Sequence, residues 1–164
     1  MLNEPKKADQ HGHWRAVEQL LVEAQPRLER ALIAQRGVDG AKDAAAEAIA
    51  WGLANTTRLG EMTNPIGYLY RVAVTRSVPR RQPLLPPVDA TRLPEVEPGL
   101  VPALLALPER QRVSVWLVHA CEWSYHEVAD ALGIGTSTVG THVGRGLDSL
   151  RDALGHNPHH GESR

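Results

Sequence analysis

Proline is the residue that most constrains how this chain folds. Seven of its twelve prolines lie between residues 79 and 102. Each proline fixes φ and removes a backbone N–H, so neither a helix nor an interior strand can persist there. We therefore predict an extended Pro-rich linker over residues 79–102, with a folded segment on either side.

The composition is that of a globular protein, with 42% apolar and 23% charged residues. No run of about 18 apolar residues occurs, and the N-terminus lacks an apolar stretch of signal-peptide length, so we expect a cytoplasmic protein with no membrane association. Cys121 is the only cysteine, which excludes an internal disulfide and a thiolate metal site. A net charge of −1 argues against coating nucleic acid by bulk attraction, so any DNA recognition must be local or assisted.

Helical periodicity accounts for most of the first half of the chain, residues 1–78. An apolar stripe indicates two helices or one bent helix over residues 13–36, with Pro26 either starting the second helix or kinking a single one. A further, Ala-rich helix is expected from Ala41 to about Thr56. Strand patterns are scarce throughout, so the fold class that we predict is all-α.

Polar residues of the first half fall on two helix faces. Asp43 and Glu47 lie one turn apart and share an exposed face. Asn64 and Pro65 have the pattern of an N-cap followed by the first helical position, and the helix that they open must end near Pro79. The polar side chains left available on this helix are Arg71, Thr75 and Arg76. This half should form a compact bundle of three or four helices.

The second half has a sharper local pattern. Proline in the first turn starts a helix at residues 107–109. Ser124 and Glu127 have the spacing of a capping box, which begins the next helix. Gly133 stands where a left-handed residue ends that helix, and Thr136 or Ser137 then caps a last amphipathic helix. Two helices joined by a short glycine turn predict a helix-turn-helix.

The first turns of the last helix carry hydrogen-bond donors at exposed positions, where side chains enter the major groove of DNA. The donors are Ser137, Thr138, Thr141, His142 and Arg145. Arg145 is the best candidate, because a guanidinium binds guanine or phosphate through two hydrogen bonds.

Residues 107–154 resemble the minus-35-binding domain of bacterial extracytoplasmic-function sigma factors. The shared motifs read LPERQR, SYHEVADALGI and TVGTHVGRGLDSLR in this chain. In the first half, GVDGAKDAAAEAIAWGLANTTRL resembles the segment that docks on the polymerase clamp, and NPIGYLYRVAVTR resembles the helix that handles the minus-10 element. Gly140 and Gly144 depart from the family, since many relatives carry larger side chains there, so few base contacts are expected.

The resemblance implies two small helical domains and a role for several residues. It implies a sigma region 2-like domain over residues 1–78, the linker over 79–102, a region 4-like helix-turn-helix domain over 103–155 and a disordered tail over 156–164. The residues implied to meet a basic coiled coil of core RNA polymerase are Asp43 and Glu47. The residues implied to bind minus-10 DNA are Asn64, Tyr68, Arg71, Thr75 and Arg76, and those implied to bind minus-35 DNA are Ser137, Thr138, Thr141, His142 and Arg145.

The resulting hypothesis is a sigma factor whose partners are core RNA polymerase and promoter DNA; an anti-sigma partner stays open. Two alternatives remain, namely a free helix-turn-helix regulator and a degenerate sigma-like protein that binds polymerase or a regulator without initiating. No nucleophile paired with a base, phosphate loop or fixed metal-ligand spacing occurs, so we expect no enzyme activity, cofactor or metal. The histidines of the two tails, His11, His13, His156, His159 and His160, are interpreted as tail residues rather than ligands.

Overall fold

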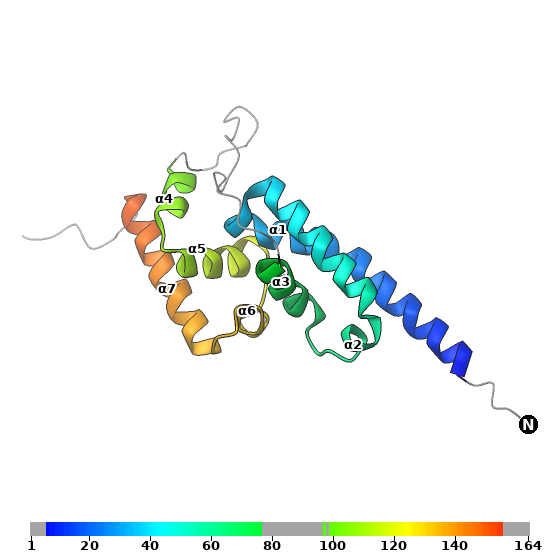
Figure 1. The fold of residues 1–164 in the computed structure, drawn as a ribbon. Coiled ribbons are helices and arrows are strands. Elements are labelled where there is room, and N and C mark those ends of the chain that lie inside the picture. Colours follow the sequence, from blue (N-terminus) through cyan, green and yellow to red (C-terminus); the bar gives the residue numbers. More distant parts are fainter. Residues whose placement is uncertain (1–5, 77–96, 98, 156–164) are drawn as a thin grey trace, which may run out of the picture.

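The computed structural model describes residues 6–76, 97 and 99–155, and it has helices α1 to α7 in these ranges with no strand among them (Figure 1). The predicted all-α fold is therefore confirmed. The linker over residues 79–96 and the tail over residues 156–164, with its three histidines, lie outside the described residues.

Helix α1 (Lys6–Ala54) consists of two arms joined at Gly37. Gly37 has φ 70° and ψ 175°, a conformation that glycine adopts most readily. The chain turns back there, and the first arm (6–36) and the return arm (38–54) lie beside each other in Figure 1. A Cβ added at Gly52 would lie 2.7 Å from Leu21 Cδ2, which shows how closely the two arms pack.

The first arm begins earlier than expected, and it decides between the alternatives left open at Pro26. It begins at Lys6, so His11 and His13 lie within the helix rather than in a tail. It also passes through Pro26 without ending, which favours the single-helix alternative. Pro26 and Val22, the residue four positions before it, are both exposed, so water is available to the carbonyl that loses its helical partner.

Two further helices complete the first half. The short helix α2 (Thr56–Gly60), which we did not predict, places Leu59 in the core. Helix α3 (Pro65–Arg76) begins as predicted, with the Asn64 side-chain oxygen accepting the Gly67 N–H at 2.9 Å. At the other end of α3, the buried guanidinium of Arg36 donates to the Val74 carbonyl. A cation there stabilises the negative end of the helix dipole.

The second half begins earlier than the proline pattern predicts. Helix α4 (Leu100–Ala106) includes three residues that we had assigned to the linker. Pro102 is its third residue, where the backbone N–H has no partner within the helix, so the ring removes no helical hydrogen bond. Helix α5 (Glu109–Val115) follows and continues into a π-helical turn over Trp116–Ala120.

The helix-turn-helix is made of α6 (Tyr125–Leu132) and α7 (Thr136–Ala153). The Ser124 and Glu127 capping box is confirmed, and Gly133 has the expected left-handed conformation, with φ 66° and ψ 38°. The predicted cap of α7 by Thr136 or Ser137 is wrong. The N-cap is Gly135, whose extended backbone leads directly into the helix without a side-chain hydrogen bond.

The two halves pack against each other and share one hydrophobic core. The ring of Tyr70 on α3 meets Trp123 edge-on, with 5.7 Å between centroids, and both side chains are buried. The Trp116 indole N–H donates to the Arg30 carbonyl at 2.8 Å. In Figure 1, α3 and α6 lie side by side at the centre of the molecule. We call the contact between α1, α3, α5, the π-helical turn and α6 the seam.

Two glycines of α7 provide a matched test of this packing. A Cβ at Gly146 would lie 2.6 Å from Val115 Cγ2 on α5, whereas a Cβ at Gly144 meets nothing within 4 Å. Overpacking costs ~1–3 kcal/mol and alanine gains ~0.5–1 kcal/mol over glycine in a helix. Gly146→Ala should therefore lower the free energy of unfolding by about 1–2 kcal/mol and Gly144→Ala should raise it slightly. Urea denaturation measures both, and equal effects would contradict the packing of α5 on α7.

Candidate nucleic-acid interface

The first turns of α7 present polar side chains to solvent, as the sequence predicts. Ser137, Thr138, Thr141 and Arg145 are exposed and His142 is half-buried. The opposite side of the helix packs into the core through apolar side chains that include the buried Val139 and Val143. The Thr141 hydroxyl donates to the Ser137 carbonyl at 3.1 Å, so it offers lone pairs rather than its proton to a ligand.

The two glycines within this face have different surroundings. A Cβ at Gly140 would lie 3.5 Å from Cε2 of Tyr125, the first residue of α6, so an aromatic ring packs beside this glycine. Gly144 faces open space. Asp148 lies one turn beyond Arg145 and pairs with Arg151 at 2.8 Å. Arg145 is thus the one arginine of the exposed face of α7 without a carboxylate partner among the described ion pairs.

A second group of polar residues gathers around Tyr68 on α3. The ring of Tyr68 lies 5.1 Å from that of Trp51 between centroids, and the guanidinium carbons of Arg58 and Arg71 lie 5.4 and 5.6 Å from its centroid. Such distances allow cation–π attraction. The sequence predicted Tyr68 and Arg71 as site residues but not Trp51 or Arg58. Arg58 belongs to α2, which was missed, so no helical face could be assigned to it.

The remaining polar residues of α3 are partly engaged within the chain. Asn64 caps α3 through its oxygen and donates its amide nitrogen to Asp130 of α6 at 3.3 Å. The Thr75 hydroxyl donates to the Arg71 carbonyl at 2.8 Å. Arg71 and Arg76 are exposed. Of the residues predicted to bind minus-10 DNA, Arg71, Thr75 and Arg76 therefore face water. Asn64 instead contacts α6 of the second half.

A cleft of about 600 Å³ separates this face of α3 from the helix-turn-helix. The first half contributes Asn64, Tyr68 and Arg71 to its walls. The second half contributes Asp130 and the turn from Gly133 to Gly135. The predicted minus-10 residues Asn64, Tyr68 and Arg71 thus face the turn that leads into α7, and the predicted minus-35 residues lie outside the lining of this cleft.

Asp43 and Glu47 are both exposed on the return arm of α1, as predicted. Glu47 also borders a hollow of about 680 Å³ that Arg76, at the end of α3, helps to line. One predicted polymerase-binding residue, Glu47, and one predicted minus-10 residue, Arg76, therefore line the same hollow.

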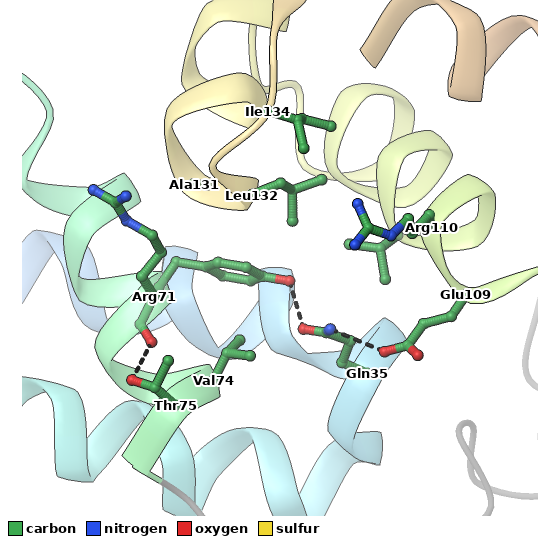
Figure 2. A pocket seen from close by; sticks show the side chains of 11 residues that line it. Gln35, Arg71, Val74, Thr75, Glu109, Arg110, Ala131, Leu132 and Ile134 are labelled. Carbon is green, nitrogen blue, oxygen red and sulfur yellow. Dashed lines mark hydrogen bonds between the residues drawn. The ribbon is translucent and has the colours of Figure 1, made fainter. Parts of the chain in front are cut away.

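A cavity of about 350 Å³ lies within the seam (Figure 2). Its floor carries a chain of hydrogen bonds, in which the Tyr70 hydroxyl donates to the Gln35 oxygen at 2.8 Å and the Gln35 amide donates to Glu109 at 3.1 Å. Burial raises the pKa of Tyr70 far above its ordinary value, so the phenol remains a hydrogen-bond donor. Apolar side chains including Leu132 and Ile134 form much of the opposite wall.

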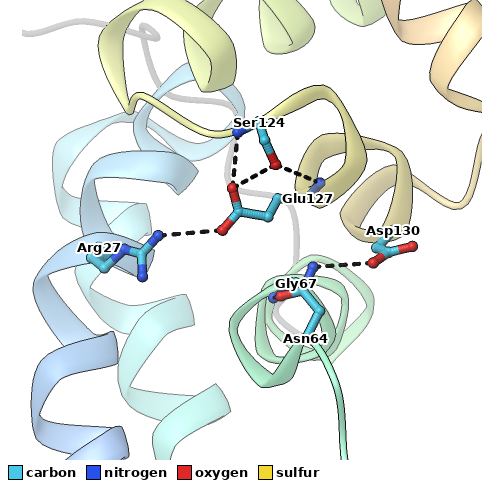
Figure 3. A network of polar contacts seen from close by, with 6 residues as sticks. All are labelled: Arg27, Asn64, Gly67, Ser124, Glu127 and Asp130. Atoms are coloured by element: carbon cyan, nitrogen blue, oxygen red, sulfur yellow. Dashed lines mark hydrogen bonds and ion pairs between the residues drawn. The ribbon is translucent and has the colours of Figure 1, made fainter.

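Glu127 connects α6 to both its own cap and the first half (Figure 3). One carboxylate oxygen accepts the Ser124 N–H and hydroxyl, each at 2.8 Å, and the other lies 3.7 Å from Arg27 of α1. Burial raises the pKa of Glu127, but the hydrogen bonds from Ser124 and the charge of Arg27 outweigh it, so the pKa is lowered overall.

No group of three or more histidine, cysteine, aspartate or glutamate side chains gathers as a metal site in the part of the chain that the structure describes. Of the helices described, none has the length and apolarity needed to cross a membrane.

Comparison with known proteins gives a family match and a structural match. Residues 100–150 match the family described as Sigma-70, region 4. The structure is similar to that of the sigma factor RpoE from Bartonella quintana, solved in complex with the anti-sigma factor NepR. The two chains are 18% identical, the match covers 84% of this chain and 96% of that one, and the TM-score is 0.63. Residues 100–150 thus match sigma-70 region 4, and the fold of the chain is similar to that of a sigma factor, so the predicted resemblance to sigma factors is confirmed.

The lowered pKa of Glu127 predicts a pH-dependent contribution to stability. Because the pKa in the folded chain lies below its ordinary value of 4.5, the charged carboxylate stabilises the fold above about pH 4.5 and loses this effect as the pH falls through the folded value. The loss of stability in Glu127→Gln, relative to the unchanged protein, should be greatest near neutral pH and should shrink as the pH falls below 4.5 and through the lowered pKa of Glu127. Urea denaturation at several pH values measures it, and a loss independent of pH would contradict the assignment.

Proposed function

We propose that this protein is a sigma factor that directs RNA polymerase to specific promoters. In this function the first half binds core polymerase and the opened minus-10 strand, and the second half binds minus-35 DNA. The observation that carries the proposal is the exposed polar face of α7 within a region 4 helix-turn-helix. Sigma factors are not enzymes, and the chemistry of transcription belongs to polymerase.

Core binding is assigned to Asp43 and Glu47. Both are exposed on a rigid helix and project from positions one turn apart, which suits a basic partner surface. Charge complementarity of this kind contributes mainly to the rate of association and to specificity. Since Glu47 and Arg76 border the same hollow, polymerase bound at this arm would hold the opened strand close to α3.

Minus-10 binding is assigned to the face of α3, including Asn64, Tyr68, Arg71, Thr75 and Arg76. An aromatic ring offers a stacking surface to an unpaired base, and neighbouring arginines bind the sugar-phosphate backbone. Trp51 and Arg58 extend this surface, because both lie against Tyr68.

Minus-35 binding is assigned to Ser137, Thr138, Thr141, His142 and Arg145 at the start of α7. Arg145 is the strongest contributor, because a guanidinium can donate two hydrogen bonds to one guanine base. Tethering by polymerase makes this contact effectively intramolecular, so a nearly neutral protein with few base contacts can still select promoters.

A second candidate function is that of a sigma-like protein that binds polymerase or a regulator without initiating transcription. The observation that favours it is Gly144, which leaves open space on the face of α7 that would read DNA. A free helix-turn-helix regulator is the third alternative, and it would bind operator DNA without polymerase. We further propose an anti-sigma factor as a partner, since the similar Bartonella quintana sigma factor was solved with one.

The polymerase-binding role predicts a salt-dependent defect. Asp43→Lys/Glu47→Lys should weaken binding to core polymerase by at least tenfold at low salt and less at high salt, because repulsion replaces attraction and salt screens both. Glu18→Lys/Glu23→Lys makes the same charge change at exposed positions of the first arm and should leave core affinity nearly unchanged. Equal affinities for the two double variants, each with unchanged helicity, would exclude Asp43 and Glu47.

The minus-35 role predicts a defect at Arg145. Arg145→Ala should cost about 1–3 kcal/mol of recognition and relax the preference at one promoter position if the side chain contacts a base. A phosphate contact would instead weaken all sequences alike and reduce the salt slope by about one. Arg151→Ala, on the same helix, is the matched control, since Arg151 already pairs with Asp148. Transcription from a randomised minus-35 library measures the effect, and identical preferences and yields for all three proteins would exclude Arg145 from minus-35 recognition.

A further inference from the structure

The cavity of about 350 Å³ in the seam has the size of a small-molecule binding site, for which volumes of ~300–1,000 Å³ are usual (Figure 2). Its wall is formed by side chains from α1, α3, α5 and α6 and from the turn after α6. The described lining contains none of the residues assigned to minus-35 DNA or to polymerase, although Arg71 and Thr75 of α3 border it. A ligand there would therefore occupy a site of its own.

The deep part of the cavity is apolar. Val113 on α5 and Ala131 on α6 line it, and each is only 2% exposed. The half-buried side chains of Val74, Leu132 and Ile134 extend this lining. A ligand with an apolar body would bury its surface against these groups, and such burial favours binding.

The uncharged polar groups of the wall bond to each other and to a carboxylate. The Tyr70 hydroxyl donates to Gln35, and Gln35 donates to Glu109. Tyr70 is buried, whereas Glu109 is exposed, so this chain of hydrogen bonds runs from the deep part of the cavity to its mouth. The charged groups of the site thus lie at the mouth.

Arg110 is a cation at this mouth that has no partner. Its side chain is exposed, and it takes part in none of the ion pairs among the described residues. Arg71, the other cation of the wall, lies 5.6 Å from the ring centroid of Tyr68 and points away from the other lining side chains in Figure 2. Two arginines against the one carboxylate of Glu109 give the described wall a net charge of +1.

We propose that this cavity binds a small monocarboxylate with an apolar body. Arg110 pairs with the carboxylate at the mouth, because a guanidinium can donate two parallel hydrogen bonds to a carboxylate. The apolar body lies in the deep part, against Val113 and Ala131. A single negative charge matches the net charge of the wall, whereas the double charge of a phosphate ester would exceed it. The site goes beyond promoter selection and needs neither DNA nor polymerase.

Hexanoate is the ligand used to test the site, with hexanol and hexylammonium as comparisons of the same chain length. Amide chemical shifts of the ¹⁵N-labelled full chain report binding and its location. We expect saturable shifts at residues 109–113 and 131–134 with hexanoate, and a Kd on the order of 1 mM. Hexanol, which cannot pair with Arg110, and hexylammonium, which would have to bind Glu109, should each bind at least about fivefold more weakly.

Two variants separate the charged and the apolar contributions. Arg110→Gln should weaken hexanoate binding by at least about fivefold and leave hexanol binding unchanged. Ala131→Leu places a larger side chain in the deep part of the cavity and should weaken both ligands. The matched control is Arg15→Gln, which removes an exposed arginine of the first arm that lies outside the cavity, and it should bind both ligands as the unchanged protein does. Circular dichroism verifies that each variant keeps its helicity.

The proposal is overturned if hexanoate gives no saturable shift up to about 20 mM, or if the shifts lie away from the lining residues. Equal binding of hexanoate and hexylammonium overturns it as well, and so does equal hexanoate affinity in Arg110→Gln and Arg15→Gln. If Ala131→Leu fails to fold, the comparison of these two arginine variants decides the outcome alone. Every measurement uses the protein without polymerase, so the result does not depend on the proposed role in transcription.

Discussion

The contact between Tyr70 and Trp123 is the interaction on which the arrangement of the two halves depends. Both rings are removed from water, and they meet edge-on, the geometry in which the positive edge of one ring faces the negative face of the other. The buried Tyr70 hydroxyl needs a partner, and Gln35 supplies it while bonding onward to Glu109. A single side chain thus connects α3 with α1, α5 and the segment before α6.

Unusual backbone conformations place these groups. The π-helical turn ends at Ala120, and Glu122, with φ 58°, adopts a left-handed conformation that is uncommon for residues other than glycine. This turn brings the Trp123 N–H to the Leu117 carbonyl at 3.0 Å and directs its ring to Tyr70. Such local strain persists only where the surroundings compensate for it, and the buried seam provides that compensation.

The features predicted from sequence are those with a local physical cause. The Ser124 capping box, the Asn64 cap and the left-handed Gly133 each depend on a few neighbouring residues, and the structure has all three. The features that sequence missed depend on contacts between distant segments. Nothing near Arg58 indicates that it lies against Tyr68, and nothing near Gly140 indicates the ring of Tyr125. The seam was missed for the same reason, because Tyr70 and Trp123 belong to different halves of the chain.

Selection of promoters for RNA polymerase is the function proposed for this chain. The most direct measurement incubates core polymerase and the protein with fragmented genomic DNA and sequences the 5′ ends of the RNA produced. We expect new start sites that share a spaced pair of upstream elements and that require the protein. Stable binding of the protein to core polymerase without any such start sites would contradict the claim.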